Sequence, residues 1–203
     1  NEQMPAEVPK VTIQLPLYNE YFVVERLINS VCEIEYPKDK LEIQVLDDST
    51  DETQELCKKV VNEMANKGFN IKYVHRDNRQ GFKAGALKYG LDFAEGEYVA
   101  IFDADFVPNK DFLMKTIPHF NDTNIGMVQT RWEHLNEEYS FLTKAQALAL
   151  DGHFVIEQQV RNKAGFFINF NGTAGVWRKS CIYDAGNWQA DTLTEDLDLS
   201  YRA

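Results

Sequence analysis

Basic residues are scarce in this 203-residue sequence, which has 21 Lys and Arg against 32 Asp and Glu and a formal net charge of −11. A protein that binds the phosphate backbone of a nucleic acid needs clustered Lys and Arg. The charge balance therefore argues against a nucleic-acid partner. An acidic surface of this kind is typical of a protein that simply stays in solution.

Cysteine and histidine are also rare. The three cysteines, Cys32, Cys57 and Cys181, are odd in number and form no Cys-x-x-Cys pair. That pattern favours reduced thiols in a cytosolic setting over a disulfide framework. The four histidines lack the spacing of metal ligands, so we expect them to be surface or packing residues.

No stretch approaches the roughly eighteen consecutive apolar residues that a membrane-spanning helix needs. No signal-peptide pattern is visible either, so we predict that this chain is itself soluble. It begins with Asn1 rather than Met and ends at Ala203 inside a helical-looking run. We therefore expect it to be a segment of a longer protein.

The first half of the sequence alternates strand-like and helix-like segments. Short apolar runs predict strands at 11–15, 41–46, 71–74 and 98–102, with helical periodicity between them. Residues 49–52 form a potential capping box for the second helix, and the third is predicted over about 83–93. This order predicts an α/β fold with a parallel sheet and right-handed crossovers.

The second half is less regular, and no linker or repeat separates it from the first. We predict helices at 108–120 and 139–161, an extended segment at 127–131, and a final helix that begins near Thr194. We interpret the chain as one domain.

Polar residues gather where each predicted strand of the first half ends. Four clusters follow the four strands in turn: Asn19-Glu20, Asp47-Asp48, residues 79–83, and Asp103 with Asp105. Ligands of open α/β sheets bind at the carboxyl ends of the strands. We therefore expect the clusters to lie along one edge of the sheet.

The stretch FDADF at 102–106 places two carboxylates one residue apart at a strand end. In an extended chain, Asp103 and Asp105 project to the same side and repel each other unless a positive group lies between them. Carboxylate oxygens suit Mg²⁺ or Mn²⁺, which often share their ligands with substrate phosphates. The alternatives are an ordinary acidic loop, or a haloacid-dehalogenase-like phosphatase in which Asp103 attacks phosphate.

Two further clusters have both structural and functional interpretations. Asp47-Asp48 could form a helix-entry turn, or its carboxylates could accept hydrogen bonds from a base or ribose. Arg79 and Lys83 flank Gly81 ahead of a helix and could bind an anion there, or they could be solvated loop charges. The local sequence leaves these alternatives open.

The stretch TEDLD contains three carboxylates within four residues: Glu195, Asp196 and Asp198. Acidic residues in a first helical turn complement the helix dipole. A carboxylate here could instead act as a general base that takes a proton from an attacking hydroxyl. Nothing in the local sequence separates these roles.

Seven stretches in this order resemble the family-two inverting glycosyltransferases: LPLYNE, LDDSTD, GFKAGAL, FDADF, VQTRW, FNGTAGVWR and TEDLDLSYRA. The nearest resemblance is to the cellulose synthase-like A and C enzymes, which make β-mannan and β-glucan backbones. It covers roughly residues 9–203.

The resemblance implies the GT-A fold and a nucleotide-sugar donor. Residues of about 9–105 would form the nucleotide-sugar-binding half, and about 106–203 the acceptor-binding and catalytic half. Tyr18 and Glu20, with Asp47 or Asp48, would hold the base and ribose, and Lys83 would lie near the donor.

The resemblance also implies the catalytic groups. Asp105, assisted by Asp103, would hold Mn²⁺ or Mg²⁺ on the diphosphate of the nucleotide sugar. Asp196 would be the catalytic base. Three residues would line the site of the glycan acceptor: Asn171, Gly172 and Thr173.

One departure from the resemblance concerns polymer synthesis. Processive members carry a Gln-x-x-Arg-Trp motif after TED, followed by membrane helices. Gln129-Thr130-Arg131-Trp132 has only one intervening residue and precedes TED. We expect these residues alone to bind donor and to make little polymer, or to act only as a nucleotide-sugar-binding module. The full-length protein would lie at the cytoplasmic face of a membrane.

The donor sugar is a choice between the two kinds of relative. Mannan-type relatives use GDP-mannose and glucan-type relatives use UDP-glucose. The stretch FFINFNGT leads us to favour UDP-glucose.

Overall fold

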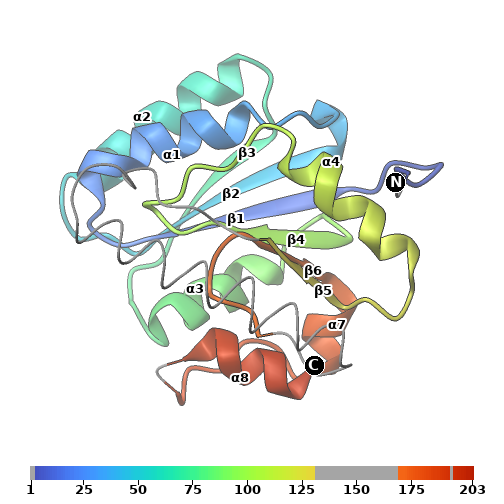
Figure 1. Cartoon of the computed structure of the whole chain (residues 1–203). Coiled ribbons are helices and arrows are strands. Elements are labelled where there is room, and N and C mark those ends of the chain that lie inside the picture. Colours follow the sequence, from blue (N-terminus) through green and yellow to red (C-terminus); the bar gives the residue numbers. More distant parts are fainter. Residues whose placement is uncertain (1–2, 131–168, 193) are drawn as a thin grey trace, which may run out of the picture.

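The computed structural model describes residues 3–130, 169–192 and 194–203. Within these residues, a six-stranded sheet in the order β3-β2-β1-β4-β6-β5 lies between two layers of helices (Figure 1). The strands are β1 (Val11–Leu17), β2 (Leu41–Asp47), β3 (Ile71–His75), β4 (Tyr98–Ile101), β5 (Met127–Gln129) and β6 (Gly175–Arg178). The first four are parallel, while β6 runs antiparallel to both β4 and β5.

The helices divide between the two faces of the sheet. Helices α1 (Tyr21–Cys32), α2 (Thr53–Asn66) and α4 (Phe112–Thr116) pack on one face, and α3 (Phe82–Leu91), α7 (Lys179–Asp184) and α8 (Glu195–Arg202) on the other (Figure 1). Short 3₁₀ turns η1 (Lys38–Lys40) and η2 (Ile117–Asn121) precede β2 and follow α4. The predicted α/β alternation of the first half is therefore confirmed.

The first strand is longer than predicted, because it continues through Pro16 to Leu17. Proline has no N–H and cannot lie where both neighbours of a strand require one. Strand β1 pairs with β4 only as far as Gln14, whereas its pairing with β2 continues to Leu17. Pro16 therefore lies beyond the two-sided part of the ladder.

The predicted capping box at 49–52 is wrong. Helix α2 begins at Thr53, and the carboxylate of Asp51 accepts a hydrogen bond from the Thr53 amide at 3.0 Å. The hydroxyl of Ser49 instead accepts from the amide of Asn19 at 2.7 Å, which ties together the turns after β1 and β2. The Ser49 side chain therefore makes a tertiary hydrogen bond and does not cap the helix in the way that the local pattern predicts.

In the second half, the predicted helix at 108–120 is only α4 followed by η2. Of the extended segment predicted at 127–131, Met127–Gln129 form β5, and Arg131 lies outside the described residues. The predicted helix at 139–161 lies outside the described residues. The final helix begins after Thr194 as predicted. No helix in the described ranges is long and apolar enough to cross a membrane, and the three cysteines are unpaired.

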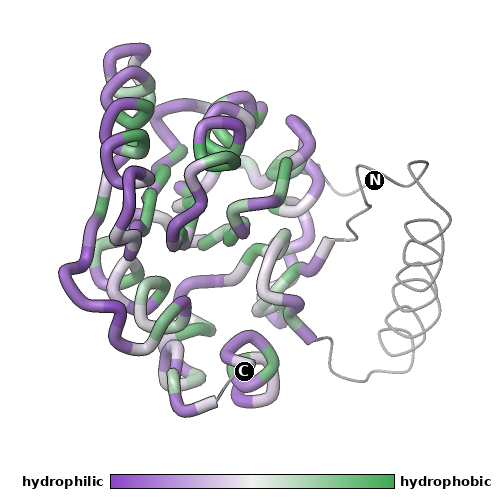
Figure 2. The backbone as a smooth tube through the Cα atoms, turned by 90° about the vertical axis from the view of Figure 1, so that its left-hand side faces the viewer, coloured by the Kyte–Doolittle hydropathy of each residue, from purple (hydrophilic) through white to green (hydrophobic). Residues whose placement is uncertain are grey.

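The two faces of the central strands differ in polarity. Val11, Ile13 and Leu15 of β1 are buried in the larger apolar core beneath α1 and α2. On the other face, Gln14 donates hydrogen bonds to Gln44 at 3.0 Å and to the Leu87 carbonyl of α3 at 3.3 Å. Figure 2 shows the helices with their hydrophobic residues turned toward the sheet. The polar pairs fix α3 against the sheet, and α3 carries site residues.

Core packing predicts that replacing two different phenylalanines with alanine has very different effects on the free energy of unfolding. Phe102 is fully buried, with its ring centroid 4.8 Å from that of Phe112, whereas Phe22 is 95% exposed. Phe102→Ala should lower the free energy of unfolding by about 3–5 kcal/mol because it leaves a cavity. Phe22→Ala should change it by less than about 0.5 kcal/mol. Urea unfolding measures both, and equal losses would contradict this assignment of the core.

Candidate active site at the carboxyl edge of the sheet

A cleft of about 390 Å³ opens at the carboxyl ends of β1, β2 and β4. It is lined by Pro16, Leu17, Tyr18, Glu20, Asp48, Arg79, Lys83, Ala86, Asp103, Ala104 and Asp105. Residues from all four predicted polar clusters are therefore together at one edge. The parallel strands β1, β2 and β4 place their carboxyl ends side by side, which brings segments distant in the sequence into one site.

The turn after β1 positions Tyr18 and Glu20. Between them, Asn19 adopts a left-handed conformation with φ of 57°, and its side-chain oxygen accepts a hydrogen bond from the Thr50 amide at 2.9 Å. Asparagine tolerates this backbone conformation better than most residues. Burial raises the pKa of Glu20, and the carboxylates of Asp105 and Asp103 raise it further. Three acidic side chains therefore influence one another across the cleft.

Asp48 is held by an arginine that the sequence analysis missed. Arg76 makes a bidentate contact with the Asp48 carboxylate, with Nε 2.7 Å from Oδ1 and Nη2 bonded to Oδ2. Both side chains are nearly buried, at 11% and 4% exposure. A planar guanidinium fits a carboxylate in this way. The available signal was a second basic residue after the third strand, in the same HRDNR run as Arg79.

Asp47 does not line the cleft. Its carboxylate is fully buried and accepts hydrogen bonds from the hydroxyl of Tyr73 at 2.7 Å and the amide of Ser49 at 3.0 Å. Burial raises the pKa of Tyr73, and this hydrogen bond adds to the effect. Of the two neighbouring aspartates, only Asp48 reaches the space where a ligand could bind.

Lys83 joins the two halves of the site. Its Nζ lies 2.5 Å from Oδ1 of Asp103 and donates a hydrogen bond to the Gly172 carbonyl at 2.9 Å. It also lies 3.9 Å from a carboxylate oxygen of Glu195. Burial raises the pKa of Asp103, and the Lys83 ammonium acts in the opposite direction. A lysine thus provides a positive group beside the first aspartate of FDADF.

Asp105 is exposed, and its carboxylate forms no hydrogen bond or ion pair with the described side chains. The described residues contain no group of three His, Cys, Asp or Glu side chains arranged to hold a metal ion by themselves. Magnesium and manganese sites that bind nucleotides commonly use one or two carboxylates and complete the shell with phosphate oxygens and water. The pair Asp103 and Asp105 fits a cation of that kind.

The loop before β6 carries the three residues implied for the acceptor: Asn171, Gly172 and Thr173. Gln129 fixes this loop, because its side-chain amide donates to the Thr173 carbonyl and accepts from the Asn171 amide, both at 3.0 Å. The Thr173 hydroxyl accepts a hydrogen bond from the Asp103 amide at 3.0 Å. The loop is therefore bonded directly to the end of β4. Sequence reasoning gave Gln129 no such role.

Helix α8 separates its three acidic residues. Asp198 forms an ion pair with Arg202 at 2.6 Å, on the helix itself. Glu195 faces Lys83, and burial raises the pKa of the Glu195 carboxyl. Asp196 approaches the acceptor loop, since a Cβ built on Gly172 would lie 3.1 Å from its Oδ2. None of the three lines the cleft, but Glu195 lies near Lys83 and Asp196 near Gly172.

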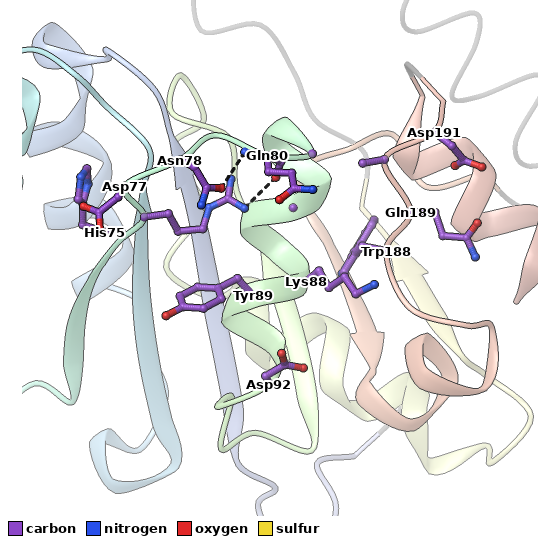
Figure 3. Close-up of a pocket in the computed structure, with 14 residues that line it drawn as sticks. His75, Asp77, Asn78, Gln80, Lys88, Tyr89, Asp92, Trp188, Gln189 and Asp191 are labelled. Carbon is purple, nitrogen blue, oxygen red and sulfur yellow. Dashed lines mark hydrogen bonds between the residues drawn. The ribbon is translucent and has the colours of Figure 1, made fainter.

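A larger cavity of about 810 Å³ lies beside α3, between the segment after β3 and the loop at 188–191 (Figure 3). Its lining includes Lys88 and Tyr89 of α3, Asp92 directly after that helix, and Trp188 on the facing side. Gln80 and Gly81 of the predicted cluster at 79–83 line it, but the carboxylates and the lysine singled out in the sequence do not. Tyr18, Glu20, Asp48, Lys83, Asp103 and Asp105 line the smaller cleft instead, so size alone does not identify the active site.

The fold is that of the GT-A glycosyltransferases. A mannosyltransferase from Pyrobaculum calidifontis, solved in complex with GDP-Man and Mn²⁺, matches 98% of this chain and 52% of its own with a TM-score of 0.78 and 25% identity. TarS from S. aureus, residues 1–349 in complex with UDP-GlcNAc, matches 96% of this chain and 53% of its own with a TM-score of 0.71 and 20% identity.

The chain belongs to glycosyl transferase family 2, whose model matches residues 12–183. Glucomannan 4-beta-mannosyltransferase 9 of Arabidopsis thaliana is 46% identical over 96% of this chain and 38% of its own length. Probable glucomannan 4-beta-mannosyltransferase 7 of Oryza sativa subsp. japonica is 46% identical over the whole chain and 35% of its own. The chain therefore spans about a third of the curated relatives it matches.

Family membership confirms the resemblance found in the sequence and leaves the phosphatase alternative without support. The preference for UDP-glucose is not supported, because these relatives are named mannosyltransferases.

The buried pair of Arg76 and Asp48 predicts strong energetic coupling. Arg76→Met should lower the free energy of unfolding by about 3–5 kcal/mol, because it leaves a buried carboxylate without its counter-charge. In a double-mutant cycle with Asp48→Asn, the coupling energy should be about 1–3 kcal/mol.

The matched control is the exposed pair of Lys115 and Asp111, whose side chains are 72% and 42% accessible. The cycle of Lys115→Met with Asp111→Asn should give a coupling below about 0.5 kcal/mol. Urea unfolding measures all six variants. Equal coupling in the two pairs would refute the structural role assigned to Arg76.

Proposed function

We propose that this chain catalyses inverting transfer of a mannosyl unit from GDP-mannose to a β-linked glycan acceptor. The observation that carries the proposal is Lys83, which lines the cleft and bonds both Asp103 after β4 and the Gly172 carbonyl of the loop before β6. The mannosyltransferase names of the relatives and the GDP-Man complex of the Pyrobaculum calidifontis enzyme support the choice of donor.

The nucleoside would lie at the carboxyl ends of β1 and β2. Tyr18 offers an aromatic face, and Glu20 and Asp48 offer carboxylates to the base and ribose hydroxyls. Asp48 has a fixed orientation because Arg76 holds both of its oxygens. Asp47 contributes indirectly, since its buried carboxylate supports the turn that presents Asp48.

The diphosphate would lie against Asp103, Asp105 and Lys83, with Mn²⁺ or Mg²⁺ held by the two carboxylates. A bound divalent cation offsets the negative charge that develops on a departing nucleoside diphosphate. The Lys83 ammonium adds a second positive group, already in place beside Asp103. Without positive charge, a phosphate group would be repelled by the acidic cleft.

The chemical step would be a single displacement. The acceptor hydroxyl attacks the anomeric carbon, the bond from that carbon to the β-phosphate oxygen breaks, and the hydroxyl proton passes to Asp196. Attack opposite the leaving group inverts the anomeric configuration. The loop of Asn171, Gly172 and Thr173 would hold the acceptor in line, because it lies between Asp196 and the end of β4.

The relatives are about three times as long as this chain, so they contain segments beyond the part that it matches. From the resemblance of the sequence to the processive family-two enzymes, we also propose that the full-length protein holds this site at the cytoplasmic face of a membrane. The competing hypothesis is a nucleotide-sugar-binding module without turnover. Measured release of GDP from GDP-mannose, compared with binding of GDP alone, separates the two.

Metal-dependent binding is the first test of the site. GDP should bind the protein more tightly with Mn²⁺ than with EDTA, and Asp105→Ala should remove that difference, as measured by titration calorimetry. Asp39→Ala, at an exposed position in η1, is the matched control and should keep it. Equal GDP affinity with and without metal in the unaltered protein would refute the metal role of Asp103 and Asp105.

The base assignment is tested by three isosteric changes on α8. Asp196→Asn should lower mannosyl transfer to a short β-mannan oligosaccharide by about 10²–10⁴-fold, because the amide cannot accept the hydroxyl proton. GDP affinity should be unchanged, since the nucleotide contacts lie elsewhere. Glu195→Gln should have a milder effect, and Asp198→Asn almost none because Asp198 pairs with Arg202.

If Asp196→Asn keeps near-normal turnover while Glu195→Gln abolishes it, the base is Glu195. Loss of GDP binding in Asp196→Asn would show that this residue supports the fold of the cleft rather than proton transfer.

A further inference from the structure

One arginine of the cleft lies on an aromatic ring instead of on a carboxylate. The guanidinium carbon of Arg79 lies 3.4 Å from the centroid of the Tyr18 ring and 5.1 Å from that of Phe82. Arg79 and Tyr18 both line the cleft. A planar guanidinium at this distance stacks on the face of the ring. It therefore covers the aromatic surface that the proposed function gives to the nucleobase.

Among the described residues, this guanidinium has unused hydrogen-bonding capacity. Two basic residues line the cleft, and Lys83 is bonded to Asp103 and Gly172. Within the described ranges, no hydrogen bond or ion pair involves the Arg79 side chain. A guanidinium carries five N–H donors, and an exposed cation–π contact is weak. Arg79 can leave the ring at little cost and offer its donors to a ligand.

The backbone that carries Arg79 is fixed. The Phe82 amide donates to the Arg79 carbonyl at 3.0 Å, and Gly81 and Phe82 have positive φ values of 74° and 49°. A positive φ at phenylalanine is strained and persists only where other contacts enforce it. Arg76 supplies them, because it donates to the carbonyls of Gln80 and Phe82 at 3.0 and 3.1 Å. The guanidinium of Arg79 can change position, while its backbone stays beside the cleft.

We propose that Arg79 selects guanine over uracil in the nucleoside diphosphate. A base that stacks on Tyr18 displaces the guanidinium, and base–aromatic stacking is stronger than an exposed cation–π contact. The displaced side chain then meets the edge of the base. Guanine presents O6 and N7, an adjacent pair of acceptors that matches the guanidinium fork. Uracil has no adjacent acceptor pair of this kind, so only guanine gains the bidentate contact.

The inference rests on the proposed function, since it requires a nucleoside diphosphate in this cleft. Its test is calorimetric titration of the protein with GDP and with UDP, each in the presence of Mn²⁺. The variants are Arg79→Gln, which removes the charge, and Arg79→Lys, which keeps the charge and loses the fork. Arg26→Gln is the matched control, because Arg26 is an exposed arginine of α1 that does not line the cleft.

The unaltered protein should bind GDP at least about tenfold more tightly than UDP. Both Arg79 variants should weaken GDP binding by about tenfold or more, in the range expected for one bidentate contact to a base. UDP binding should change by less than about threefold, and Arg26→Gln should alter neither affinity. The quantity that decides the matter is the ratio of the two dissociation constants.

The other outcomes are distinguishable. Failure of the unaltered protein to bind either nucleotide overturns the proposed function itself. An equal loss of GDP and UDP affinity in Arg79→Gln, restored by Arg79→Lys, overturns the inference alone and makes Arg79 a phosphate-binding charge. Unchanged affinities in both variants, or tighter binding of UDP than GDP by the unaltered protein, also overturn guanine selection while leaving nucleotide binding intact.

Discussion

The contact on which the site depends is the ammonium group of Lys83 between two segments that are far apart in the chain. It lies 2.5 Å from Asp103 at the end of β4 and 2.9 Å from the carbonyl of Gly172 before β6. Strands β4 and β6 are antiparallel neighbours, so their hydrogen bonds bring the two segments together. One positive charge, that of Lys83, then links the segment that follows β4 to the loop that precedes β6.

The Lys83 ammonium also reduces the repulsion among the carboxylates that surround it. Glu20, Asp103, Asp105 and Glu195 share a small region of a protein whose net charge is already −11. Burial raises the pKa of Asp103 and Glu195, and neighbouring carboxylates add to this. The carboxylates remain close because the sheet fixes where the strand ends lie. A site of this kind has a strong attraction for cations, which is the property that binding of a diphosphate through a metal ion requires.

Two arginines that follow β3, Arg76 and Arg79, differ in their surroundings. Arg76 is nearly buried and uses its guanidinium on Asp48 and on the turn at 80–82. Arg79 is exposed, and its guanidinium lies against the rings of Tyr18 and Phe82. The sequence HRDNR does not distinguish them, because both are basic residues after a strand. Their difference arises from burial, which commits Arg76 to a carboxylate and leaves Arg79 free to move.

The sequence by itself determined the α/β alternation, the family and the edge of the sheet where polar residues gather, because each follows from local periodicity or from ordered motifs. Only the tertiary structure decided between neighbours of like chemistry. It buried Asp47 against Tyr73 and turned Asp48 into the cleft, and it paired Asp198 with Arg202 while Asp196 approached the acceptor loop. Adjacent carboxylates have the same intrinsic chemistry, so their roles depend on which partners the fold places within hydrogen-bonding distance.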